Sequence, residues 1–385
     1  MPPRRQILEC IGLALGIRLA VLVIGYGAIF AFGYASTEFP PNTASSELAN
    51  LPARWDTGWY VGIADGGYRA TGPDSRYPNI VFFPAYPLAL RAVTTLIHAR
   101  HRPFVFEWAG VCLSIGFFVC ASIYLFRLAL EHHHLSPTQG MMAVALLAAY
   151  PFAVFYGAVY TESLFLLTVL ATFYHAHRNQ PLRGSLWGLL AGLTRPTGML
   201  VSVPLAVMLW QRESSKGTRP SITAFAPALA PLIGAALYSA FLYSLVGNPL
   251  AWMQAQHQWG RTGYAVWMDI AQLHAITTIP AAELYLRDHL NVVLNGSAIV
   301  FVVLLLPLVT VRLGWPATLF VLISILPGLS FGGLMSMGRF TAVIFPVFLA
   351  LASIRSQTIC WICLITFSLG QAFVSSMFFT WRSIY

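Results

Sequence analysis

Long apolar runs constrain the fold of this chain more than any other feature. They lie at about residues 10–32, 104–128, 221–246, 291–311 and 358–379, and each approaches the roughly 20 residues that a helix needs to cross a bilayer. Hydrophobic residues make up 57% of the 385 residues and charged residues only 9%, whereas an ordinary soluble domain is about 25% charged. So few charges cannot cover a soluble surface.

The sequence therefore predicts an all-α, polytopic integral membrane protein. Counting shorter apolar segments gives about ten or eleven spans. Arg4 and Arg5 precede the first run, so the positive-inside rule places the N-terminus in the cytoplasm. Residues 34–102 and 247–290 then form two long extracytoplasmic loops of one domain, residues 1–385. Pro84 and Pro87 interrupt an apolar stretch in the first loop, which predicts short helices there and no span.

The net charge of +9 comes from 22 basic and 13 acidic residues, and Lys216 is the only lysine. Most arginines lie in short loops between apolar segments, so we interpret them as determinants of membrane orientation and of affinity for an anionic lipid substrate, without nucleic-acid binding. The preference for Arg over Lys suggests a bacterial source. That favours the bacterial plasma membrane, with the endoplasmic reticulum membrane as the eukaryotic equivalent.

The acidic residues are distributed unevenly in this topology. Ten of the 13 acids fall in the outer loops or at the outer membrane boundary: Glu38, Glu47, Asp56, Asp65, Asp74, Glu107, Glu162, Asp269, Glu283 and Asp288. The chemistry is therefore expected at the extracytoplasmic face.

Asp56 is the leading catalytic candidate. It lies in the first outer loop between Trp55 and Trp59, two residues after Arg54 and four before Tyr60. Aromatic walls raise the pKa of a carboxyl group and an adjacent guanidinium lowers it, so such surroundings tune a general base. The alternative is an interfacial aromatic belt with a solvated carboxylate. Asp65, nine residues later, either shares this site or, as we favour, caps the turn before Tyr68.

Three further charged residues interrupt apolar sequence. Glu162 follows Tyr160 between two apolar runs, where an ionisable group usually faces a cavity or a partner; the alternative is an acid that favours a helix N-terminus. Arg195, at the tip of a short predicted hairpin, and Arg339, between two apolar segments, are candidates to bind a phosphate. The alternative for both is snorkelling to lipid headgroups.

The second outer loop gathers amides, indoles and a guanidinium. Gln256, Trp259 and Arg261 lie within a few residues of one another there. Aromatic rings with amide donors suit the apolar face and the hydroxyls of a sugar, and an amphipathic interfacial helix has the same composition. Both interpretations stay open.

No metal or nucleotide cofactor is expected. The histidines at 132–134, 175 and 177 lack the spacing of known zinc motifs, and no Walker or dinucleotide motif occurs. An outer-face transferase would also have no cytoplasmic pool of nucleotide sugars, so its activated donor would be a lipid phosphate.

Several ordered blocks together resemble the PIG-V-type mannosyltransferases, the GPI mannosyltransferase II family, and more broadly the GT-C glycosyltransferase superfamily. They are Arg54-Trp55-Asp56 through Ile63-Ala64 and Gly67-Tyr68; Phe82-Phe83-Pro84 with Tyr86-Pro87; Tyr150-Pro151; Tyr160-Thr161-Glu162-Ser163-Leu164-Phe165; Arg195-Pro196-Thr197-Gly198; Gln256 to Trp259; and Ser336 to Phe340 with Pro346. They span nearly the whole chain in the expected order.

The resemblance implies an inverting transferase that moves mannose from a polyprenyl (dolichyl-type) phosphate to a hydroxyl of a glycolipid, glycan or protein acceptor, with Asp56 as the general base. From the resemblance and the charge pattern together, the expected substrate-binding residues are Arg54, Trp55, Trp59, Tyr60, Asp65, Tyr68, Tyr160, Glu162, Arg195, Gln256, Trp259, Arg261 and Arg339. The chain is short for a eukaryotic member, and a bacterium builds no GPI anchor, so the sugar and the acceptor stay open. The competing hypothesis is a lipid-linked sugar flippase without transferase activity.

Overall fold

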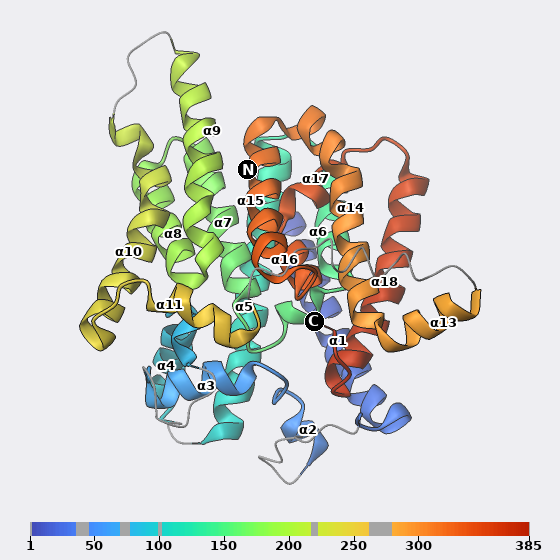
Figure 1. The fold of residues 1–385 in the computed structure, drawn as a ribbon. Helices are drawn as coiled ribbons and strands as arrows, with labels where there is room; N and C mark the ends of the chain where they lie inside the picture. The colour runs from blue at the N-terminus through green and yellow to red at the C-terminus, as the bar shows by residue number, and fades with distance from the viewer. Residues whose placement is uncertain are drawn as a thin grey trace.

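The computed structural model describes residues 2–35, 46–69, 78–98, 102–216, 222–261 and 279–384, and all regular elements in these ranges are helical. The predicted fold class is confirmed. The helices of the bundle's first half, followed by those of its second half (Figure 1), have these bounds: α1 Arg4–Phe32, α2 Glu47–Asn50, α3 Thr57–Gly66, α4 Ala85–Leu96, α5 Pro103–Glu131, α6 Pro137–Ala149, α7 Glu162–His177, α8 Pro181–Thr194, α9 Ser202–Ser214; then α10 Ala226–Val246, α11 Ala251–Gln254, α13 Ile279–Asp288, α14 Leu290–Leu313, α15 Trp315–Gly332, α16 Met337–Ala342, α17 Phe345–Ala352 and α18 Gln357–Phe379.

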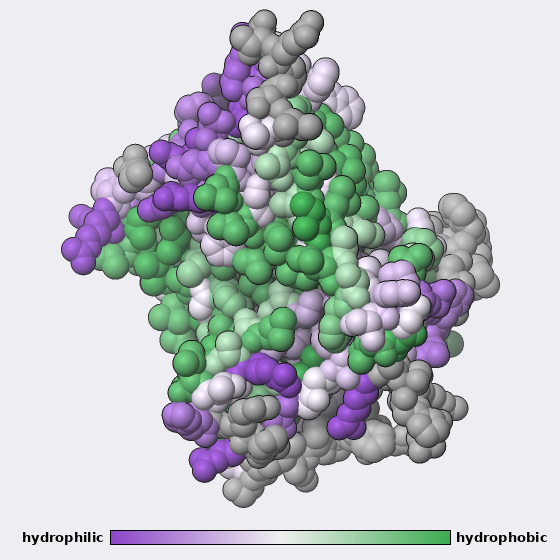
Figure 2. Space-filling model, turned by 90° about the vertical axis from the view of Figure 1, so that its left-hand side faces the viewer, coloured by the Kyte–Doolittle hydropathy of each residue, from purple (hydrophilic) through white to green (hydrophobic). Residues whose placement is uncertain are grey.

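Among the described residues, six helices are long and apolar enough to cross a membrane: α1, α5, α10, α14, α15 and α18. Figure 2 shows a broad apolar band between polar ends of the molecule. Large side chains such as Leu229, Ile233 and Leu237 on α10 are exposed, as expected of a surface that contacts lipid. The other expected spans are shorter helices, so the total of ten or eleven stays a prediction.

The short helices α2, α3 and α4 of the first long loop gather at the lower end of the bundle in Figure 1, with α11 just above α3 and α4 and with α13 on the far right. The predicted short helix is confirmed, because α4 has only 12 residues, with Pro84 as its N-cap; that it does not cross the membrane stays a prediction. The basic end of α9 lies at the opposite, upper end. One end of the bundle therefore carries both the first loop and the start of the second.

Helices α8 and α10 approach each other closely through small residues. A Cβ atom on Gly192 would overlap the carbonyl oxygen of Pro231, and one on Gly234 would overlap that of Leu189. Small residues at such spacing allow helix backbones to pack directly in a membrane. Since α8 ends at Thr194, this contact fixes the position at which the chain presents Arg195.

The connection between α6 and α7 is buried inside the protein. Helix α6 ends just before Pro151, and the carbonyls left without helical partners need donors. Arg18 of α1 donates to the carbonyls of Ala148 and Ala153, and Gln371 Nε2 of α18 donates to Ala148 at 2.8 Å. A buried arginine and a glutamine thus stabilise an irregular segment at membrane depth.

The same connection is bound to the segment around α16. The hydroxyl of Tyr150 lies 2.9 Å from Thr341 Oγ1, and the hydroxyl of Tyr156 donates to the carbonyl of Ala342. These bonds join residues nearly two hundred positions apart. They place the start of α7, at Glu162, next to α16.

We expect Gly192→Ala to destabilise the protein by about 1–3 kcal/mol, because the added methyl group would force α8 away from the Pro231 carbonyl. Gly116→Ala on α5 is the matched control, since nothing lies within 4 Å of the place that its Cβ atom would take and alanine is the better helix former. Thermal unfolding of the purified protein in detergent measures both. Equal stability of the two variants would contradict this packing.

Candidate functional site

Four charged side chains from distant parts of the chain form one continuous series of ion pairs. Arg339 Nη1 donates to Asp56 Oδ2 at 2.9 Å, and Arg339 Nε donates to Glu162 Oε1. Arg195 Nη2 donates to the same Glu162 oxygen at 2.5 Å. The structure therefore brings together four residues that the sequence predicted separately.

Asp56 is positioned as the N-cap residue of α3, but its carboxylate does not cap the helix. An N-cap aspartate usually accepts a hydrogen bond from the first helical turn, whereas this side chain is directed to Arg339. The backbone N–H of Asp56 donates to the Tyr160 hydroxyl at 2.9 Å. With 22% of its side chain exposed, Asp56 stays accessible to a substrate.

The surroundings of Asp56 adjust its acidity in opposite directions. Burial raises the pKa of Asp56 above the ordinary value, and the nearby Glu162 raises it further, while Arg339 and Arg261 lower it. The net effect is a raised pKa, which strengthens the carboxylate as a proton acceptor near neutral pH.

Glu162 is the buried centre of the series. Its side chain has no exposed surface, and that of Arg195 is 8% exposed. Glu162 is the first residue of α7, where the helix dipole favours an acid. Arg195 follows α8 and also donates to Thr161 Oγ1 at 3.3 Å. Glu162 therefore fits both predictions: it is an acid at the start of a helix, and it has the charged partners expected of an ionisable group within apolar sequence.

Arg339 is held by α16 among aromatic rings. Its Cζ atom lies 4.8 Å from the ring centroid of Tyr160 and 5.7 Å from that of Phe155. Ser336, the N-cap of α16, has a left-handed backbone (φ 63°), as does Trp55 (φ 53°) directly before Asp56. Strained backbone of this kind clusters at functional sites, and here it closely precedes both partners of one ion pair.

Arg261 lies beside this series without joining it. Its Cζ atom is 5.2 Å from the ring centroid of Phe340, and that of Arg195 is 5.6 Å from the same ring. Burial, with Arg339 and Arg195 nearby, lowers the pKa of Arg261 to about 10. Within the part of the chain that the structure describes, its guanidinium has no ion-pair partner.

An aromatic cluster of Trp59, Phe82 and Trp259 joins the two long loops. Trp59 stacks on Phe82 with centroids 5.9 Å apart, and Trp259 meets both edge-on at 5.1 and 5.2 Å. Trp259 Nε1 donates to the carbonyl of Pro78 at 3.2 Å. Because Trp59 is one turn after Asp56 on α3, this cluster lies near the acidic end of the series.

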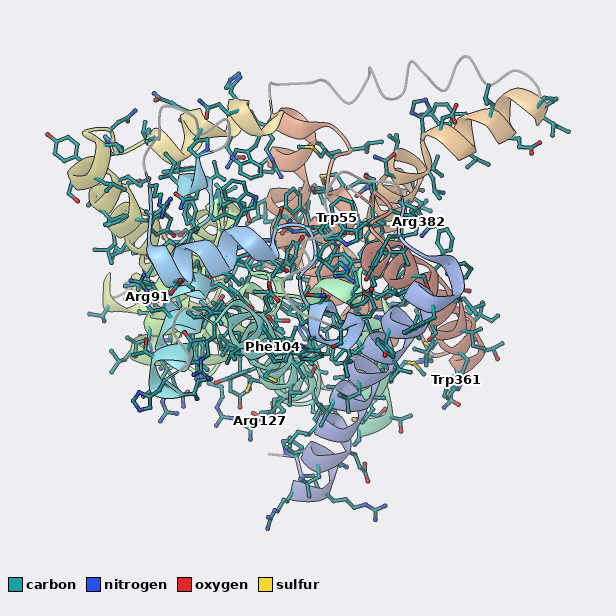
Figure 3. The ribbon with its side chains drawn as sticks, turned by 90° about the horizontal axis from the view of Figure 1, so that it is seen from below. Trp55, Arg91, Phe104, Arg127, Trp361 and Arg382 are labelled. Carbon is teal, nitrogen blue, oxygen red and sulfur yellow. The ribbon has the colours of Figure 1, made fainter. Side chains whose placement is uncertain are left out.

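The side chains of Arg54 and Trp55 donate hydrogen bonds to backbone carbonyls of this protein. Arg54 is buried and donates to the carbonyls of Phe379 at 2.8 Å and Asn50 at 2.6 Å, and Trp55 Nε1 donates to Phe378 at 3.0 Å. Figure 3, which shows the lower end of the molecule, places Trp55 near Arg382. Both residues bind the C-terminal end of α18, and their predicted role in substrate binding stays a prediction.

The remaining candidates surround the series at different distances. Tyr60 is buried, with its ring centroid 5.8 Å from that of Tyr160. Asp65 is two and a half turns after Asp56 and therefore on the opposite side of α3. Tyr68 donates to the carbonyl of Phe82 at 2.7 Å. Gln256 is half-buried, and its carbonyl accepts from the Arg261 N–H at 3.2 Å.

Sequence reasoning missed the rings that surround the guanidinium groups. Phe340 contacts both Arg195 and Arg261, and Phe155 contacts Arg339. Phe82 and Phe340 belong to blocks that carried the resemblance, but neither was assigned a place in the site, and nothing in the sequence singled out Phe155.

Three acids predicted at the outer face, Glu38, Asp74 and Asp269, lie outside the described residues. Across the described ranges, no group of three or more His, Cys, Asp or Glu side chains is arranged to hold a metal ion.

A family model described as Mannosyltransferase (PIG-V) matches residues 29–243, more than half of the chain. The match includes Asp56, Glu162 and Arg195, whereas Arg261 and Arg339 follow its end. No curated protein matches the chain.

We expect Glu162→Gln to lower the free energy of unfolding by about 3–5 kcal/mol, because it leaves the buried Arg195 without a counter-charge and removes one of the two carboxylates that pair with Arg339. The matched control is Glu131→Gln, whose pair with the 39% exposed Arg178 lies nearer the surface and should contribute much less to stability because solvent screens it. Denaturant or thermal unfolding in detergent compares them. Equal losses would contradict a buried, cooperative site.

Proposed function

Because this chain belongs to the PIG-V family of mannosyltransferases, we propose that it transfers mannose from a polyprenyl-phosphate carrier to an acceptor hydroxyl, with Asp56 as the general base. The family makes it a membrane mannosyltransferase. The donor, the base and the side of the membrane are the parts that we infer.

The observation that carries the proposal is the state of the Asp56 carboxylate. It is partly exposed, does not cap its own helix, and is held by Arg339 at 2.9 Å. A carboxylate held in one orientation with a raised pKa suits proton abstraction.

The reaction follows from these groups as a single displacement. Asp56 takes the proton of the acceptor hydroxyl while the acceptor oxygen forms a bond to the anomeric carbon. The bond from that carbon to the phosphate oxygen breaks, and its electron pair stays on the phosphate. Attack opposite to the leaving group inverts the anomeric configuration. Positive charge near the leaving phosphate stabilises the transition state.

A lipid-linked donor agrees with the place of the site in the bundle. The series of ion pairs includes Asp56, which belongs to the first loop. The end of the bundle that carries this loop lies opposite the end of α9, where Arg212 and the following Lys216 lie. By the positive-inside rule the basic end is cytoplasmic, so we place the reaction at the extracytoplasmic face. A donor anchored in the bilayer is available there, and a bacterial plasma membrane fits the composition.

The cluster of Trp59, Phe82 and Trp259 is the proposed sugar-binding surface, because aromatic faces pack against the apolar face of a hexose. The competing flippase hypothesis has no observation of its own in the structure, and the family match favours transfer. A flippase would move the lipid-linked sugar between leaflets without forming a glycosidic bond.

We expect Asp56→Asn to reduce the transfer rate by about 10²–10⁴-fold, the usual contribution of a general base. The amide oxygen can still accept from Arg339, so the variant should insert and bind donor. Glu283→Gln, on the exposed surface of α13, is the control for loss of a carboxylate at this end. Purified protein with polyprenyl-phosphate-mannose, a panel of acceptors and mass spectrometry provides the assay. Near-normal turnover by Asp56→Asn would overturn the assignment.

We expect transfer to require the deprotonated form of Asp56, so activity should fall as the pH drops through its pKa. Because burial raises that pKa, the acid limb of a plot of kcat/KM against pH should lie above the ordinary carboxyl value of about 4. A pH titration of the wild-type enzyme with saturating acceptor measures it. An acid limb at or below the ordinary value would contradict a base in these surroundings.

A further inference from the structure

The three arginines of the site differ in what they already bind. Arg195 and Arg339 both donate to Glu162, and Arg339 also donates to Asp56. Arg261 is different, since no carboxylate in the described ranges accepts from its guanidinium. A half-buried guanidinium beside two like charges is unfavourable unless an anion joins it.

Among the described residues, the site has more positive than negative groups. Arg195, Arg261 and Arg339 lie with the two carboxylates of Asp56 and Glu162, so this group of five side chains holds one surplus positive charge. A phosphodiester between a prenyl chain and a sugar carries one negative charge and would make the group neutral.

The local backbone explains how the second loop presents Arg261. The 3₁₀ helix Ala255–Trp259 ends at Gly260, which has a left-handed backbone (φ 77°), and the Arg261 N–H returns to the Gln256 carbonyl at 3.2 Å. This turn sends Trp259 towards Trp59 and Arg261 towards Phe340. One short segment therefore contacts both the aromatic cluster and the cationic group.

We propose that Arg261 binds the phosphate of the lipid-linked donor while the neighbouring Trp259 borders the sugar attached to it. This inference rests on the proposed function, because it assigns one part of the donor to one side chain. The arrangement matches the covalent order of a sugar phosphate, in which the sugar and the phosphate are directly bonded. The planar guanidinium suits two oxygens of a phosphate.

The charges also balance through the reaction. When the bond between the anomeric carbon and the phosphate oxygen breaks, the carrier phosphate gains one negative charge. At the same time Asp56 loses one by taking the acceptor proton. The total charge of the site is unchanged, and the new charge develops on the phosphate that Arg261 contacts. Arg261 therefore binds the donor and stabilises the leaving group.

The test uses the purified full-length protein with farnesyl phosphate, farnesol and inorganic phosphate as separate probes. We expect farnesyl phosphate to raise the melting temperature of the wild type more than the other two probes do. Arg261→Gln should bind farnesyl phosphate about 10-fold to 100-fold more weakly. Its melting temperature should rise no more with farnesyl phosphate than with farnesol. Without ligand its stability should equal or exceed that of the wild type, because a like-charge contact is removed.

Two further variants separate this role from a structural one. Arg261→Lys should restore part of the binding because it retains the charge, and Arg69→Gln, an exposed arginine of the first loop, should leave binding unchanged. An unchanged response of Arg261→Gln to farnesyl phosphate, or equal protection of the wild type by inorganic phosphate or farnesol, would overturn the inference.

The transfer assay distinguishes failure of this inference from failure of the proposed function. If the wild type transfers mannose and Arg261→Gln retains the wild-type KM for the donor, only the role of Arg261 is wrong. If the wild type binds farnesyl phosphate through Arg261 but transfers no sugar, the phosphate site stands and the transferase mechanism falls.

Discussion

The site depends on one buried carboxylate. Glu162 Oε1 accepts from Arg195 and from Arg339, and through them it joins α7, α8 and α16, which are far apart in the sequence. Between membrane helices apolar burial gives little preference for one arrangement over another, since lipid tails are as apolar as leucine. A fully buried acid shared by two guanidiniums does specify an arrangement, because a shift of any of the three would leave a charge unpaired at membrane depth. Arg339, which is held by Glu162, in turn holds the carboxylate of Asp56.

The backbone on either side of the Asp56–Arg339 contact is strained and firmly held. Trp55 and Ser336 both have left-handed conformations, each of which costs about 1–3 kcal/mol outside glycine. The indole of Trp55 donates to the carbonyl of Phe378, and Asn295 Oδ1 accepts from the Gly338 N–H at 2.7 Å. These bonds stabilise the strained segments from elements outside the site. The carboxylate and the guanidinium are therefore held in place before a substrate arrives, which reduces the reorganisation that the reaction would require.

The sequence predicted the fold class, and it singled out the charged residues that the structure brings together, but it did not predict their partners. Length and apolarity alone identify helices such as α1 and α14, because a bilayer demands both. Asp56, Glu162 and Arg339 stood out as charges in apolar surroundings, but Asp56 and Arg339 are separated by 283 positions, and no local pattern reports a contact at that distance. Arg54 illustrates the converse. Its place near Asp56 suggested substrate binding, whereas its Nε donates to the Phe379 carbonyl at the end of α18 and its Nη1 to the Asn50 carbonyl, a demand created only by the tertiary fold. The number of spans stays a prediction, because α6, α7, α8 and α9 have 13 to 16 residues, fewer than the roughly 20 that a helix needs to cross a bilayer.

Coupling between the donor and the base follows from the same charges. Before the donor binds, Arg339 and Arg261 both lower the pKa of Asp56, which weakens it as a proton acceptor. In the proposed mechanism, a phosphate anion bound to Arg261 would offset part of that positive field and would raise the pKa of Asp56 further. The proposed base would then be strongest when the donor is bound. A carboxylate surrounded by apolar groups alone would be equally basic with and without the donor. The additional guanidinium, which has no ion-pair partner among the described residues, therefore fits a site in which binding of the donor prepares the acceptor's base.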